Sequence, residues 1–481
     1  MTYPGFPFPP RTPLYPSHDH VEAYHRSFAS HFELYPYIRF NHSVESVQWV
    51  GDASNGFWEL SISSNGPQVE IVPLSKTSVR NTRRRSRITR RFDHLVVANG
   101  HLHYPKFPPW STDDAANQWL QNEKDRSIVH SIYFRDPEEY TGKVVLVVGS
   151  GSSGQDIAIQ LGGHAGKVLR FPSPLLSAEV ADSNAPQVYH SLSGSGRPLP
   201  QEVPGVIYKP RTKSFTSTSV QFEDGTEVFD VDIVILGTGY EYRFPFLDPS
   251  DPYNQPARVP SAHKPHAIVS TNPSAYSRPE GEQRLTENLK YLFPIDRQIV
   301  SLSSLHPLNA LLFIGLPVPI IHAPNDIAQS MFAGHLIAQP DRLYPTSHIT
   351  GHEAWNETLA RELLLQDLTA YENRLAGEGI DVYHLGHRAD VGSVNWHNYQ
   401  DSLIVYLQSQ GLAPRHDRDY VFVEPWRIRA LDNNVQLRKI WEEIESQGER
   451  EMERWLGGVE TEEEWADLMD RLLKWGEEHV F

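Results

Sequence analysis

The chain contains no cysteine among its 481 residues. This absence excludes disulfide scaffolds, cysteine-ligated zinc sites, iron–sulfur clusters and dithiol reductases. Long hydrophobic runs are missing as well, since the longest, residues 310–321, is broken by two prolines and is too short to span a bilayer. The N-terminus is rich in proline and aromatic residues and lacks the apolar region of a secretory signal. We therefore expect a cytoplasmic protein without a membrane span.

Positive charge is also scarce. The 43 lysines and arginines face 60 aspartates and glutamates, which gives a net charge of −17. This balance argues against a nucleic-acid partner or an anionic membrane surface. Hydrophobic residues make up 39% of the chain, enough for a sizeable core, and the length suggests two to four domains. The acidic last 41 residues predict a solvated helix face.

Hydrophobic periodicity gives the order of the elements. We expect a helix at 18–32, a β-meander over 43–75, a buried strand ending at Gly100 and a short helix at 115–120. A βαβ unit follows from Val144, with an apolar strand, a glycine turn, a helix and a second strand at 167–171. A hairpin turns at Asp224-Gly225, another buried strand ends at 240, and the chain beyond 330 is mostly helical.

The strongest motif is the glycine turn Gly149-Ser150-Gly151-Ser152-Ser153-Gly154, which follows an apolar strand and opens a helix. This is the context that a dinucleotide-binding G-x-G-x-x-G requires. The first glycine permits the tight turn, the second admits the pyrophosphate, and the third allows close packing of helix and strand. The helix N-terminus then offers free N–H groups to phosphate.

The expected second strand indicates which dinucleotide binds. NAD sites place an acid about 20 residues after the first glycine, but no acid occurs in residues 167–173. Arg170 and Ser173 there could bind a 2′-phosphate instead. The motif therefore favours NADP over NAD.

Two further buried strands end in glycine-containing turns, at Asn99-Gly100 and at Gly237-Thr238-Gly239. Glycines there allow the chain to turn away while a ligand lies over the edge of the sheet. Taken singly, each of these turns is expected to have only a structural role. Together with the glycine motif they suggest an architecture that binds two nucleotides.

Residues 137–161 and 220–247 resemble the NADPH-binding and later segments of flavin-containing monooxygenases. His130 lies where that family's identifying sequence has its histidine, and Phe134 matches the final position, whereas Arg126 and Lys124 replace its glycine and leading aromatic residue. The FPFP at 6–9 and the segment 35–47 are similar to the family too. The resemblance covers most of residues 1–335.

The resemblance implies FAD and NADP as cofactors, O2 and a small molecule as substrates, and a role for His130 in positioning the nucleotide region. The family's N-terminal FAD fingerprint, its ribose acid and its asparagine near the flavin have no counterpart here. We therefore expect an N-terminally incomplete chain or a non-catalytic homologue. No catalytic side chain stands out, because in such enzymes the cofactor carries the chemistry.

The predicted fold is α/β, a flavoprotein architecture with two Rossmann-like dinucleotide-binding domains, an incomplete FAD domain, a β-meander and a helical C-terminal extension. Residues 1–140 would begin the flavin domain, 141–236 would bind NADP, and 237–481 would complete the flavin domain and form the extension. The expected activity is NADPH- and O2-dependent oxygenation of a soft nitrogen or sulfur, similar to that of N,N-dimethylaniline monooxygenases. A flavin-less NADP-binding protein and a Baeyer–Villiger enzyme are the alternatives.

Two features favour structural interpretations. The arginine-rich segment 76–91 is typical of a solvated hairpin loop, with a nuclear-localisation or polyanion patch as the alternative. The 23 histidines include three close pairs, but none has a supporting carboxylate cluster, so we expect no metal site.

Overall fold

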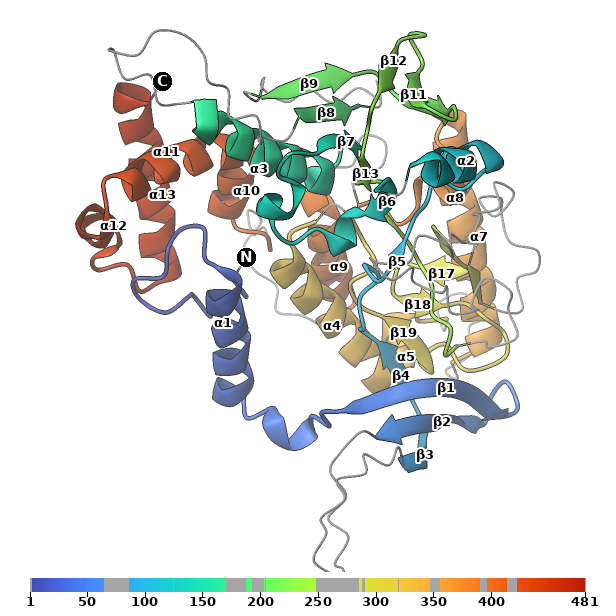
Figure 1. Ribbon diagram of the computed structural model, residues 1–481. Coiled ribbons are helices and arrows are strands. Elements are labelled where there is room, and N and C mark those ends of the chain that lie inside the picture. The colour runs from blue at the N-terminus through green and yellow to red at the C-terminus, as the bar shows by residue number, and fades with distance from the viewer. Residues whose placement is uncertain are drawn as a thin grey trace, which may run out of the picture.

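The computed structural model describes most of the chain (Figure 1). The described residues are 2–64, 86–123, 125–169, 187–192, 203, 205–247, 285–287, 290–318, 320–346, 355–389, 396–412 and 422–480.

A five-stranded sheet, parallel throughout, carries the glycine motif at its centre. Its strands in spatial order are β6 (Ser127–His130), β13 (Ile233–Leu236), β7 (Val144–Val148), β8 (Gln187–Ser191) and β9 (Val206–Lys209). Val145 and Val147 pack with Ile157 and Leu161 of α3 (Ser152–Leu169) on one face. Leu146 and its neighbours pack on the other face against a second cluster. Because both faces are buried, β7 is apolar at every position.

That second cluster joins the sheet to a small antiparallel unit and a helix. The unit consists of β10 (Thr212–Phe215), β11 (Ser219–Phe222) and β12 (Glu227–Phe229), and its hairpin turns at Asp224-Gly225 as the sequence predicts. The helix is α2 (Asp114–Asn122), capped by the Asp113 carboxylate, which accepts from the N–H of Ala116. Trp119 of α2 is fully buried against Phe215.

The prediction of a strand at residues 167–171 is wrong. Helix α3 continues through Leu169, and the strand that pairs with β7 is β8, which begins at Gln187. A run of apolar residues after a helix suits the end of that helix as well as a new strand, and periodicity alone does not separate the two.

The predicted meander is present with a different third strand. Strands β1 (His42–Gly51) and β2 (Gly56–Ser64) pair antiparallel as expected, and the third strand is β3 (Ser86–Phe92). The arginine-rich stretch therefore ends in a strand, where the sequence predicted a loop up to residue 91. The remainder of that stretch and the strand expected at 68–75 lie outside the described residues.

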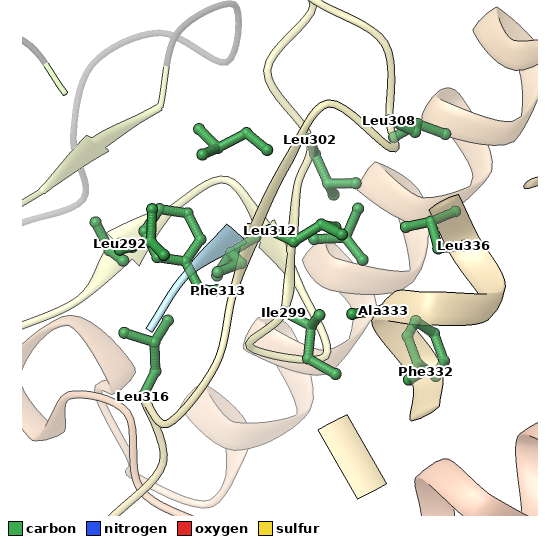
Figure 2. Packing of buried hydrophobic residues seen from close by; sticks show 14 of the residues in the cluster. Leu292, Ile299, Leu302, Leu308, Leu312, Phe313, Leu316, Phe332, Ala333 and Leu336 are labelled. Atoms are coloured by element: carbon green, nitrogen blue, oxygen red, sulfur yellow. The ribbon is translucent and has the colours of Figure 1, made fainter. Parts of the chain in front are cut away.

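A four-stranded sheet stands at the centre of the largest hydrophobic cluster (Figure 2). Its order is β17 (Ile295–Asp296), β18 (Val300–Ser301), β19 (Leu311–Phe313) and β4 (Leu95–Val97), and β4 runs parallel to β19. Leu312 of β19 lies on the side of Leu336 of α4 (His322–Ala338), whereas Phe313 lies on the side of Leu292 (Figure 2). Two short ladders complete the strands: β5 (Tyr104–Pro105) with β14 (Tyr240–Glu241), and β15 (Thr286–Glu287) with β16 (Leu292–Phe293).

The C-terminal part is helical, as predicted. Its helices are α5 (Pro340–Leu343), α7 (Glu357–Gly377), α8 (Val382–Leu385), α9 (Trp396–Ser409), α10 (Pro425–Asp432), α11 (Asn434–Ser446), α12 (Glu449–Leu456) and α13 (Glu462–His479). Short 3-10 turns occur at Tyr35–Tyr37, Pro109–Ser111, Ser131–Tyr133 and Pro137–Tyr140.

The N-terminal segment packs against these last helices (Figure 1). Tyr24 of α1 (His18–His31), the helix predicted at 18–32, shares a core with Trp441 and Trp465. Buried Arg427 also donates to the carbonyl oxygen of Thr2 over 2.9 Å. The two ends of the described chain therefore form one hydrophobic cluster. No described helix is both long and apolar enough to cross a membrane.

Candidate functional site

The glycine motif forms a tight junction of three backbones. Gly149 follows β7 with φ +128°, in the region that favours glycine. A Cβ on Gly149 would lie 2.3 Å from the carbonyl oxygen of Gly237, and one on Gly154 would lie 2.2 Å from that of Gly149. A Cβ on Gly237 would come within 2.9 Å of the backbone of Gly154. Turn, helix and β13 therefore meet at a distance that only glycine permits.

Gly151 has a different environment. A Cβ there would meet no atom within 4 Å, so space lies open in front of the turn. Helix α3 begins at the next residue, Ser152, which is exposed. The side chain of Gln155 donates to the carbonyl oxygen of Ser150 over 3.0 Å and braces the turn from within the helix. An open turn at the N-terminus of an 18-residue helix suits a phosphate group.

His130 is hydrogen-bonded to the second glycine turn, Gly237-Thr238-Gly239. Its Nε2 donates to the carbonyl oxygen of Gly239 over 2.9 Å, and its Nδ1 accepts from the N–H of Ile132 over 3.3 Å. Burial lowers the pKa of His130 to about 4, so the ring is neutral at pH 7. Both ring nitrogens are bonded to backbone, and the contacts therefore give His130 a positioning role.

His190 of β8 plays the same part at the first turn, and the sequence analysis missed it. Its Nε2 donates to the carbonyl oxygen of Gly149 over 2.8 Å. The ring is 1% exposed, and burial lowers its pKa. A single histidine in a strand carries no motif, so no sequence signal could have identified it.

The turn Gly237-Thr238-Gly239 links the parallel sheet to β5. The Thr238 hydroxyl donates to the carbonyl oxygen of Lys106 over 2.6 Å, and the N–H of Lys106 donates to the carbonyl oxygen of Gly239 over 2.9 Å. The structure therefore brings Gly237–Gly239 and His130 to the same edge as the glycine motif.

Asn99 and Gly100 lie elsewhere, at the end of β4 in the four-stranded sheet. Both are exposed, and Gly100 has φ +73° with open space beside it. The parallel neighbour β19 ends at a similar glycine, Gly315, with φ +83° and open space. Gly315 was not predicted, although it follows a buried strand as the other turns do. The two glycines mark a second strand edge.

Arg170 and Ser173 lie outside the described residues. Their assignment assumed that they follow the strand next to β7, but that strand is β8, which ends at Ser191. In the sequence, the first basic residue after β8 is Arg197, which also lies outside the described residues.

A charged group lies beside the Gly239 turn. Glu241 and Arg243 form a buried ion pair, Oε2 to Nη2 at 2.8 Å, and burial raises the pKa of Glu241. Burial lowers the pKa of Lys106, and burial together with the neighbouring Lys106 lowers that of Lys290 to about 7. Within the described part of the chain, no group of three or more histidine, aspartate or glutamate side chains could hold a metal ion.

Solved structures show the fold. S-allyl-L-cysteine S-oxygenase from Allium sativum superimposes with a TM-score of 0.58 at 17% identity, covering 98% of this chain and 81% of that one. This likeness confirms the predicted α/β architecture with Rossmann-like units.

Sequence comparison shows which proteins the chain resembles. Flavin-containing monooxygenase 3 from Homo sapiens is 30% identical over 300 residues, 52% of either chain. Thiol-specific monooxygenase from Saccharomyces cerevisiae is 29% identical over 255 residues, 52% of this chain and 48% of that one. The chain thus spans about half the length of the curated relatives it matches. The model of the flavin-binding monooxygenase-like family matches residues 1–173 and 199–255, and over these segments the chain is similar to that family.

Proposed function

We propose that this protein is an NADPH- and O2-dependent flavin monooxygenase that oxygenates a soft nitrogen or sulfur of a small molecule. Members of the flavin-binding monooxygenase-like family, which the chain resembles, use FAD and NADPH. The single observation that carries the proposal is the turn at Gly149–Gly154, where Gly149 and Gly154 pack backbone on backbone with Gly237, while Gly151 faces open space.

The residues of the turn fit the pyrophosphate of NADP. Gly151 leaves room for it, and the N–H groups that open α3 would bind its oxygens. His130 and His190 would hold the carbonyl groups of Gly239 and Gly149 in place, so that both turns keep their shape when the nucleotide binds. Arg170 and Ser173 remain our proposal for the 2′-phosphate, with Arg197 as a second candidate.

The fit to FAD rests on the second strand edge. Gly100 and Gly315 end the parallel strands β4 and β19, and both have open space beside them. Asn99, exposed next to Gly100, would donate from its side-chain amide to the flavin nucleotide. When bound, reduced FAD activates O2, and the protein supplies orientation and exclusion of water.

The class of substrate follows from the relatives. Their names record N-oxide formation, thiol oxygenation and S-oxygenation of S-allyl-L-cysteine. We therefore propose an amine or a low-molecular-weight thiol or thioether as substrate. We also propose the cytoplasm as its location, since a chain without cysteine needs no oxidising compartment.

The test is O2 uptake by the purified, FAD-reconstituted protein in the presence of NADPH. We expect uptake to rise on addition of N,N-dimethylaniline or of a small thiol, with NADH as a poor replacement. A protein that binds NADPH but shows no substrate-dependent uptake would support the alternative, an NADP-binding homologue without oxygenase activity.

A further inference from the structure

A cavity of about 480 Å³ lies in the C-terminal half of the chain. Its walls come from the turn between β17 and β18, from α7, from α8 and the residues after it, and from α9. Its volume is within the range of small-molecule sites. None of the residues of the glycine turns lines it, so the proposed function leaves it unexplained.

The turn that forms one wall has an unusual sequence. The N–H of Ile299 donates to the carbonyl oxygen of Asp296 over 2.9 Å, and the two residues between them have positive φ, +48° at Arg297 and +56° at Gln298. Such a two-residue turn favours asparagine, aspartate or glycine at both positions. A long arginine and a glutamine are strained there, and strain of this kind is commonly found at functional sites.

Arg297 supplies a fixed positive charge. Its Nη1 lies 2.6 Å from Oδ2 of Asp296, which also accepts from the Tyr344 hydroxyl over 2.8 Å. The guanidinium group lies over the ring of Tyr406, 4.3 Å from its centre. Among the described residues, no hydrogen bond engages Nε or Nη2 of Arg297. These donors suit a carboxylate, which arginine binds with two parallel hydrogen bonds.

Gln298 supplies the complementary acceptor. Its Oε1 is buried and has no hydrogen-bond partner among the described residues. A buried acceptor without a partner is costly, and a ligand N–H would remove that cost. Asp367, exposed on the lining of the cavity, adds a negative charge that favours a cationic group.

The other walls combine apolar and aromatic side chains with polar ones. The apolar and aromatic members include Ile295, Leu368 and Val382 and the rings of Tyr291, Tyr371 and Tyr399, and the polar members are Arg388, Asn398 and Ser402. Tyr399 is fixed in the wall, because its hydroxyl donates to the carbonyl oxygen of Arg297 over 2.7 Å and accepts from the side chain of Gln329, also over 2.7 Å. Such walls bind an apolar or aromatic body beside the polar end at the turn.

We propose that this cavity is a second small-molecule site that binds an amino acid with an apolar side chain. The carboxylate lies on Arg297, the ammonium group donates to Oε1 of Gln298, and the side chain packs among the tyrosines. The site shares no residue with the nucleotide-binding turns. Its ligand is therefore bound in addition to the cofactors of the proposed oxygenation reaction.

The probe is 4-fluoro-L-phenylalanine, titrated into the full chain and followed by fluorine NMR. Two competitors each lack one polar group: 3-phenylpropionate lacks the ammonium group and phenethylamine lacks the carboxylate. We expect saturable binding of the probe, with both competitors at least about 10-fold weaker than L-phenylalanine, because each loses one charge-assisted contact.

Three variants test the residues. Arg297→Lys keeps the positive charge beside Asp296 but removes the pair of parallel N–H donors of the guanidinium group, so we expect about 10-fold weaker binding of the probe. Ser402→Trp places a large ring on an exposed lining position and should block the cavity. Gln298→Gly gives the turn a preferred residue, so the protein should melt at the same or a higher temperature while it binds the probe less well.

Arg438→Lys, in an exposed ion pair on α11, is the matched control and should bind the probe as the wild type does. NADPH titration of each variant reports an intact fold independently of this cavity. The proposal is overturned if the wild type shows no saturable binding, if either competitor matches L-phenylalanine, or if Arg297→Lys and Ser402→Trp bind the probe unchanged.

Discussion

The imidazole of His190 donates a hydrogen bond from Nε2 to the carbonyl oxygen of Gly149 over 2.8 Å. A second bond joins the same two segments, from the N–H of Gly149 to the carbonyl oxygen of Ser191 over 3.0 Å. Strand β8 thus holds the first residue of the glycine turn from two sides. Because the ring is buried, protonation of Nδ1 would leave a charge in an apolar region, and the neutral form is favoured.

Replacing His190 by alanine should therefore weaken NADPH binding. The carbonyl group of Gly149 would lose its donor and the turn its fixed shape, a change of ~1–2 kcal/mol in binding free energy. Titration of NADPH by fluorescence measures the effect. The exposed His103→Ala is the matched control, and an equal loss in both variants would contradict the role given to His190.

The glycines of the turn should separate into two classes. Alanine at Gly149 or Gly154 would place a Cβ 2.3 or 2.2 Å from a backbone oxygen, so both variants should lose stability or fail to fold. Alanine at Gly151 meets open space, so that variant should melt like the wild type and bind NADPH about 10-fold less tightly. Melting temperatures and NADPH titrations distinguish these outcomes. Tight NADPH binding by Gly151→Ala would place the pyrophosphate elsewhere.

Lys290 should make stability depend on pH above neutrality. Burial and the nearby Lys106 lower its pKa from 10.5 to about 7 in the folded protein. Between pH 7 and about 10.5 the unfolded chain therefore binds more protons at this group, and stability rises with pH across that window. Below pH 7 both states are protonated, and the contribution of Lys290 no longer changes.

Lys290→Met removes this group. The variant should be more stable than the wild type near pH 7, and the difference should shrink as pH rises towards 10. Thermal melts of both proteins across this range measure it, with the exposed Lys474→Met as a control. A difference that does not change with pH would mean that Lys290 has an ordinary pKa.

The choice of NADPH over NADH should depend on one arginine. Arg170→Ala and Arg197→Ala are the pair to compare, because the first was chosen from the sequence and the second follows the strand that pairs with β7. The responsible arginine should cost ~1.5–3 kcal/mol of NADPH binding on removal, and NADH binding should barely change. Equal losses for both cofactors would mean that neither contacts the 2′-phosphate.

The sequence predicted those parts of the site that are local. An apolar strand, a glycine turn and a helix follow one another within 26 residues, 144–169, and β7 and α3 form there as expected. Strand β8 was missed because its sequence, QVYHS, is short and polar in places, whereas residues 167–169, which are apolar enough for a strand, end α3. Likewise, β3 carries arginines that its pairing with β2 tolerates and that composition assigns to a loop.

Contacts between distant residues were beyond the sequence. The amino-acid sequence alone does not predict that His190 bonds to Gly149, that Arg427 binds the carbonyl group of Thr2, or that Gly237 packs on Gly154. Each depends on how separate elements meet. The positioning role of His130 was partly predictable. A motif in the sequence marks the residue, but only the fold shows its partner, Gly239.

The most direct test of the proposed function is the flavin absorbance of the purified protein as NADPH is added without oxygen. We expect a yellow protein whose flavin is bleached by NADPH, and a slower bleaching of the Gly151→Ala variant at the same NADPH concentration. A protein that binds no flavin, or a bound flavin that NADPH leaves oxidised, would contradict it.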